Sequence, residues 1–171
     1  MSEQKGTGIH RETLMDMLAS KDGVIRQNAR EALVALGKAA VSSLTQALLN
    51  SRLDQVRWEA AKALGAINDA GSIPSLVKAL EDSNHDVAWL AADALITYKK
   101  AAWPALLQAL IKSESDSIEL RKGAHHVLVN QKEDGFNDLL TTLLQALESS
   151  AAPESSAVAA YDILKKMKVK S

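Results

Sequence analysis

The sequence predicts an all-α protein, an α-solenoid of about five two-helix repeats. Three observations predict this fold: one pattern of small and branched apolar residues recurs along the chain, alanine and leucine dominate, and aromatic residues make up only 4%. The copies lie about 31 residues apart at first, which is within the range of stacked helical units. Because small side chains let helices approach closely, this composition favours helix packing over a sheet.

The repeat is clearest in the second helix of each copy. An alanine recurs there and a leucine follows four residues later, so both lie on one helix face. These pairs are Ala29 and Leu33, Ala60 and Leu64, Ala91 and Leu95, Ala124 and Leu128 and, more faintly, Ala160 and Leu164. This face must be buried against a partner helix, and a large residue in an alanine column should cost ~1–3 kcal/mol through overpacking.

Leucine pairs four residues apart mark the first helix of each copy, and they define a second buried face. They are Leu14 and Leu18, Leu44 and Leu48, Leu76 and Leu80, Leu106 and Leu110, and Leu143 and Leu147. Pro74 and Pro104 precede two of these faces, as is typical of a first helical turn. The connectors within the hairpins are polar and supply N-capping side chains. We expect Gly37 and Gly65 to end the second helices of the first two repeats in a left-handed conformation.

The last copy departs from the pattern. We interpret residues 1–171 as a single repeat domain in which residues 149–171 form a divergent C-terminal cap and tail. The connector at 149–156 is rich in serine and alanine, and the chain ends in a lysine-rich stretch. A terminal repeat must present an outer face that is compatible with solvent, which favours the cap. A flexible docking tail is the alternative.

The string DQVRWEAAKALG at 54–65, with IPSLVKAL at 73–80, resembles the short HEAT-like repeat of phycobilisome lyase subunits and many bacterial scaffolds. The resemblance covers residues 12–148 and implies a solenoid whose first helices form the convex side and whose second helices line the concave side. In that family the arginine of the string pairs with an acidic residue of a neighbouring turn. The resemblance therefore implies this role for Arg26, Arg57 and Arg121, whereas Ala88 replaces the arginine in the third copy.

Two tryptophans are the strongest candidates for a binding site. Trp58 lies about 170° from the centre of the apolar stripe of its helix, and Trp89 occupies the same column one repeat later. We predict that they form a contiguous aromatic ridge, because tryptophan is enriched where interfaces gain most of their energy. Polar residues of the same columns complete this predicted face: Gln27, Glu31, Lys62, Asp93, Lys122 and His126. The alternative is that both indoles lie flat across neighbouring helices and cover the groove floor.

Two further patterns have structural interpretations. Trp103 precedes Pro104 in the column that holds Ile73 in the preceding repeat, so we expect it to staple the entry of a first helix to the core. Glu59 and Lys62 are three residues apart, and we expect them to form an ordinary solvated pair worth a few tenths of a kcal/mol, roughly 0.2–0.5.

The sequence carries no catalytic motif. It lacks a glycine-rich phosphate loop, a nucleophile elbow and a His-Glu-x-x-His pattern, and it has no cysteine. His125 and His126 are adjacent and therefore point about 100° apart on a helix, so they cannot both bind one ion. We predict a protein that is not an enzyme and has no cofactor and no metal. A pH-sensitive edge is the alternative role of these histidines.

Charge and hydropathy narrow the class of partner. Twenty basic and twenty-one acidic residues leave a net charge of -1, so no global field attracts a phosphate backbone. The chain shows no membrane-spanning apolar run and no secretory signal, so we predict a cytoplasmic protein without membrane or nucleic-acid partners. The predicted function is a non-catalytic scaffold that binds a protein or peptide on its concave face. The alternatives are a subunit of a bilin lyase-type enzyme, which the resemblance suggests, and nucleic-acid binding, which the mixed columns support less.

Overall fold

The computed structural model describes residues 3–112, 117–148 and 153–169, and within these ranges the chain is all-α and contains no strand. The helices alternate between first and second members of successive hairpins. They are α1 (Glu3–Met17), α2 (Gly23–Leu36), α3 (Lys38–Asn50), α4 (Asp54–Ile67), α5 (Ile73–Ala79), α6 (His85–Thr97), α7 (Trp103–Lys112), α8 (Ile118–Leu128), α9 (Asn137–Glu148) and α10 (Pro153–Val169). Two short 3₁₀ helices, η1 (Ala70–Ser72) and η2 (Lys99–Ala102), precede α5 and α7.

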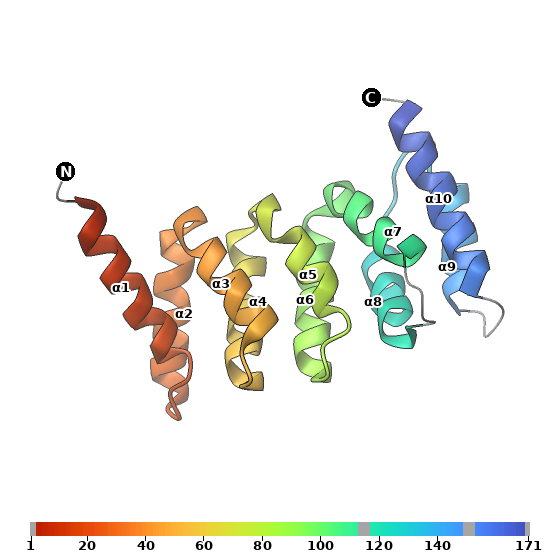
Figure 1. The fold of residues 1–171 in the computed structure, drawn as a ribbon. Coiled ribbons are helices and arrows are strands. Elements are labelled where there is room, and N and C mark those ends of the chain that lie inside the picture. The colour runs from red at the N-terminus through yellow and green to blue at the C-terminus, as the bar shows by residue number, and fades with distance from the viewer. Residues whose placement is uncertain (1–2, 113–116, 149–152, 170–171) are drawn as a thin grey trace.

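The hairpins stack side by side into a solenoid, as the periodicity predicts (Figure 1). The first helices α1, α3, α5 and α7 form one layer, and α2, α4, α6 and α8 form the other. The second helices approach their neighbours more closely than the first helices do, so the stack curves towards the second-helix layer. We call the exposed side of α2, α4, α6 and α8 the concave face.

One continuous core runs between the two layers. The alanines and leucines of the second-helix pattern are fully buried in the first four repeats, and the leucine pairs of the first helices are buried as well. Trp103 is only 1% exposed, and its indole N–H donates to Gln131 at 2.5 Å. The expected stapling role of Trp103 is therefore confirmed.

The ends of the second helices follow the repeat less simply than predicted. Gly37 has the expected positive φ of 57° at the end of α2, but its ψ of -131° lies outside the left-handed helical region. The equivalent places after α4 and α6 are taken by Asn68, which is left-handed (φ 54°), and Lys99 (φ 51°). The prediction for Gly65 is wrong, because this residue lies inside α4. A Cβ atom on Gly65 would come within 2.9 Å of the Ala94 Cβ, so the glycine allows α4 and α6 to pack closely.

The last hairpin reverses the layering. α10 packs mainly against α7 and α9, and α9 lies beside α8, so the expectation that every second helix lines the concave side is wrong here (Figure 1). In the loop before α9, Phe136 is buried and meets Trp103 edge-on, with the ring centroids 5.8 Å apart. Lys166 of α10 lies 5.2 Å from the centre of the Phe136 ring and donates to the Gly135 carbonyl. The parts of the predicted cap and tail at 149–152 and 170–171 lie outside the described residues.

Candidate functional site

The predicted binding residues all lie on the second helices that form the concave face. Gln27, Lys62, Asp93 and Lys122 are exposed, one on each of the four helices. Trp89 is 48% exposed, whereas Trp58 and His126 are partly buried. Glu31, the remaining member of the columns, is exposed and accepts a hydrogen bond from Gln27 at 2.9 Å.

The first cluster on this face, the Trp58 subsite, consists of Trp58, Arg30, Glu59 and Lys62. The Lys62 ammonium lies 4.7 Å from the indole centroid, and the Arg30 guanidinium lies 6.0 Å from it. A cation within about 6 Å of an indole is attracted by the negative face of the ring. Trp58 is thus held between a cation of its own helix and a cation of α2.

Glu59 is the residue of this subsite that sequence reasoning missed. It is 3% exposed and accepts hydrogen bonds from Arg30 at 2.5 Å, from Arg26 at 3.3 Å and from Gln55 at 3.3 Å. The expectation of a solvated pair with Lys62 is wrong, because α2 covers the side of α4 that carries the carboxylate. A signal was present: Arg26 and Arg30 lie one helical turn apart on the preceding repeat, which places both on one face.

A second cluster, the Trp89 subsite, consists of Trp89, His85, Asp93 and His126. The ring centroids of Trp89 and His126 are 4.0 Å apart with the planes tilted by 34°, and His85 lies 6.2 Å from Trp89. His126 Nε2 is 3.0 Å from a carboxylate oxygen of Asp93. The structure thus brings three predicted residues together across the junction of α6 and α8.

The predicted contiguous ridge divides into these two subsites. Trp58 contacts Arg30 of α2 and Lys62 of its own helix, whereas Trp89 contacts His126 of α8 and His85 of its own helix. Within the described ranges, no ring contact joins the two indoles. The concave face therefore presents two separate aromatic positions with different neighbours.

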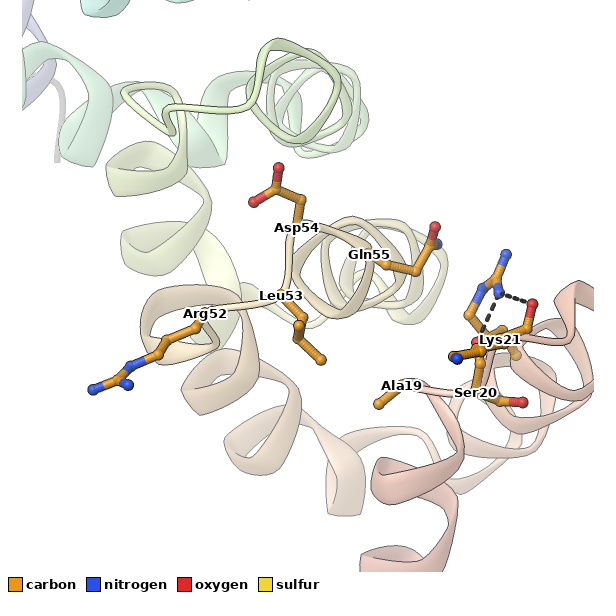
Figure 2. A pocket seen from close by; sticks show the side chains of 8 residues that line it. Ala19, Ser20, Lys21, Arg52, Leu53, Asp54 and Gln55 are labelled. Atoms are coloured by element: carbon orange, nitrogen blue, oxygen red, sulfur yellow. Dashed lines mark hydrogen bonds between the residues drawn. The ribbon is translucent and has the colours of Figure 1, made fainter.

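One hollow is lined by the Trp58 subsite, and a second hollow adjoins the first. One of about 470 Å³ runs across the concave face of α2 and α4 to the start of α6, with Trp58, Gln27 and Lys62 in its lining. The other, of about 480 Å³, lies at the loop ends of the first two repeats (Figure 2). Both are lined by Arg26, and they also share Asp54 and Gln55.

Arginines join the first repeats, as the resemblance implies. Arg57 binds both carboxylate oxygens of Asp82, at 2.7 and 2.9 Å, and also binds Asp54 at 2.8 Å. The hydrogen bond that Arg57 donates to Asp82 is the main cause that raises the pKa of Arg57. Donation by Asn84 and then by Arg57 lowers the pKa of Asp54. This bidentate arrangement is the strong form of a charge-assisted hydrogen bond. Arg57 therefore fixes the second repeat to the loop of the third.

Arg26 and Arg121 occupy the same place in other repeats. Arg26 donates to the Ser20 carbonyl at 2.8 Å and also binds Glu59 of the next repeat. Arg121 donates to the Ala146 carbonyl at 3.0 Å and so connects α8 to α9. The implied pairing with an acid of a neighbouring turn is thus seen at Arg57. Arg26 instead binds a carboxylate inside α4, and Arg121 binds a backbone carbonyl of the next hairpin.

Two other properties bear on what the surface can do. Over the part of the chain that the structure describes, no three histidine or acidic side chains are placed to hold a metal ion. Likewise, no described helix combines the length and the apolar character needed to cross a bilayer.

Comparison with known proteins identifies the repeat. A family model described as HEAT repeats matches residues 41–128, just over half of the chain, whereas a search of curated proteins finds no match. The matched region runs from α3 to α8 and includes both tryptophans of the concave face. The chain therefore belongs to the HEAT repeat family.

Proposed function

We propose that this protein is a non-catalytic scaffold that holds a protein or peptide partner on its concave face, with Trp58 and Trp89 as anchors. HEAT repeats commonly mediate protein interactions. The observation that carries the proposal is Trp89, an indole that is 48% exposed on the concave face. His126 of the next helix packs against the ring and is itself bound to Asp93, so little side-chain entropy is lost when a partner binds Trp89.

The shape of the concave face supports the same function. A solenoid offers an extended inner surface by construction. The hollow beside Trp58 lies on this surface and spans three consecutive repeats, from Gln27 to Asp86. A segment that fills it would contact several second helices at once, as an extended peptide does.

The proposed function includes the repeat type, the cellular compartment and the class of partner. We place the repeats in the phycobilisome lyase type, because Arg57 and Asp82 form the inter-repeat pair that the resemblance implies. We further propose that the scaffold acts in the cytoplasm without a cofactor, a metal or a nucleic-acid partner.

The test compares partner capture by three forms of the full chain. Trp89→Ala removes the exposed anchor, and Trp58→Phe combined with Lys62→Gln alters the other subsite while leaving a ring in the partly buried position. Lys78→Gln, on the exposed side of α5 in the first-helix layer, is the matched control. Proteins retained from the native cell extract are quantified, and circular dichroism checks the fold. We expect the concave variants to lose at least about tenfold of a specific partner, equivalent to ~1.4 kcal/mol. Undiminished capture by folded concave variants would contradict the proposal.

A further inference from the structure

We infer that the Trp58 subsite and the loop-end hollow beside it bind an acidic stretch of an extended peptide. This inference rests on the proposed function, because it specifies the chemistry of a partner on the concave face. It goes further in assigning the acidic stretch to the first two repeats and not to the Trp89 subsite.

More basic than acidic groups contact Trp58 and Glu59. Two arginines, Arg26 and Arg30, bind the single carboxylate of Glu59, so one positive charge of the three groups is not offset. Lys62 adds a second positive charge: within the described residues it makes no ion pair, and its ammonium lies 4.7 Å from the centre of the indole. The groups that contact Trp58 and Glu59 therefore carry more positive than negative charge, although the whole chain is nearly neutral.

Further basic side chains line the neighbouring loop-end hollow. Lys21 and Arg52 are exposed at its lining and lie on opposite sides of Leu53 (Figure 2). Neither forms an ion pair within the described ranges. Because the two hollows share Arg26 and Gln55, a chain that leaves the concave hollow enters the loop-end hollow beside Lys21.

The acidic residues are unevenly placed between the two hollows. The concave hollow is balanced, with Asp54, Glu59 and Asp86 against Arg26, Arg30 and Lys62, whereas the loop-end hollow has only Asp54 against Lys21, Arg26 and Arg52. Glu59 is buried under its two arginines, and Asp54 accepts a hydrogen bond at 2.8 Å from Arg57, which it shares with Asp82. Asp86 remains, but it lies at the far end of the concave hollow, in the first turn of α6. The positive charges therefore lie towards α2 and the loop ends, and the uncommitted acid lies towards α6.

The chemistry of the ligand follows from these positions. An aspartate or glutamate side chain can rest its methylene groups on the edge of the indole while its carboxylate binds Lys62 and the exposed part of Arg30. Further acidic residues of the same peptide would meet Lys21 and Arg52. Because these cations are exposed, binding should be salt-dependent and contribute more to specificity and association rate than to raw affinity.

Three tryptophans make the test specific. In a spectrum of the ¹⁵N-labelled full chain, each indole N–H gives one signal, and the buried Trp103 serves as an internal reference. The probes are acetylated, amidated hexapeptides of alternating glycine with glutamate, glutamine or lysine. We expect only the glutamate peptide to shift the Trp58 signal. Its affinity should fall about fivefold in Lys62→Gln and about fivefold between 0.05 and 0.5 M salt, with no change in Lys78→Gln.

The outcomes separate this inference from the proposed function. A lysine or glutamine peptide that shifts Trp58 as strongly as the glutamate peptide overturns the acidic specificity and leaves a concave binding face. A glutamate peptide that shifts Trp89 but not Trp58 overturns the assignment to the first repeats. If no peptide shifts any indole, the inference is wrong, and the capture experiment with the tryptophan variants still decides the proposed function.

Discussion

The first two junctions between repeats differ in chemistry from the two that follow. Glu59 joins the first junction and Arg57 with Asp82 joins the second, in each case through nearly buried arginine–carboxylate contacts. Arginine keeps its charge at any physiological pH, and its planar fork fits a carboxylate with two hydrogen bonds. These junctions are therefore held in one geometry by side chains that cannot easily rearrange.

The later junctions use histidine–carboxylate pairs, and Arg121 at the fourth junction donates to a backbone carbonyl. Ala88 stands where the arginine would be, and the contacts across the third and fourth junctions include His126 with Asp93 at 3.0 Å and His125 with Glu148 at 2.9 Å. All four side chains are at least a quarter exposed. Such exposed pairs contribute at most ~1 kcal/mol.

The difference bears on the two anchors of the concave face. Trp58 lies in the half of the solenoid whose junctions hold arginine–carboxylate pairs. Arg30, which joins the first two repeats by binding Glu59, also contacts the Trp58 ring. Trp89 lies on the half with histidine contacts, where its ring is half exposed and stacks on His126. Trp58 is thus partly buried among the groups that join the repeats, whereas Trp89 presents a half-exposed ring to a partner.

Substitution of Glu59 should give the largest effect and tests the comparison directly. Glu59→Gln leaves Arg26 and Arg30 without their shared carboxylate, and we expect the free energy of unfolding to fall by ~3 kcal/mol. Asp93→Asn, the matched change in the other half, should cost less than ~1 kcal/mol because the pair is exposed. Urea denaturation measures both, and equal losses would remove the distinction between the halves.

Double-mutant cycles measure the coupling within each type of junction. For Arg57→Ala with Asp82→Ala we expect a coupling energy of ~2 kcal/mol, because two charge-assisted hydrogen bonds are shielded from water. For His126→Ala with Asp93→Ala the expected value is below ~1 kcal/mol. A histidine pair as strongly coupled as the arginine pair would show that the later junctions are as firmly joined.

Gly65→Ala tests how closely α4 and α6 pack at the second junction. The added Cβ would lie 2.9 Å from that of Ala94, so α4 and α6 must move apart. Overpacking of ~1–3 kcal/mol outweighs the gain in helix propensity of up to ~1 kcal/mol, and we expect a net loss of ~1 kcal/mol in thermal or urea unfolding. A stabilised variant would mean that α4 and α6 accommodate the added methyl group without moving apart.

The smallest effect is expected at the end of α6, where the later half begins. Lys99 has a positive φ of 51° in the place that glycine takes after α2. Lys99→Gly should therefore raise the free energy of unfolding by up to ~1 kcal/mol, because glycine adopts this conformation without strain. Gly37→Ala should lower it by a similar amount. A destabilised Lys99→Gly variant would show that the lysine side chain contributes contacts that outweigh the strain.

Most of the fold could be predicted because it depends on local periodicity. The columns that include Ala60 and Leu64 are buried as the spacing predicts, and HEAT repeats account for the stacking. Features that depend on a neighbouring repeat were missed. The close approach at Gly65 and the placement of α10 beside α7 both arise from packing between hairpins, which no single helix encodes.

The candidate site was predictable to a similar degree. Equivalent columns on successive helices correctly placed Trp89, Asp93 and His126 on adjoining elements, and the structure brings them into contact. The division into two subsites could not be predicted, because it depends on which neighbour each indole turns towards. The burial of Glu59 was missed for the same reason, since it requires two arginines from the preceding repeat.

Site-specific photocrosslinking in the native cell tests the central claim, that the concave face is the binding face. A photoreactive phenylalanine derivative replaces Gln27, Lys62 or Lys122 on the concave face, or Gln46 or Lys78 on exposed positions of the first helices. We expect the three concave positions to give one common adduct and the two first-helix positions to give none. Adducts formed only, or equally well, from Gln46 and Lys78 would contradict the account.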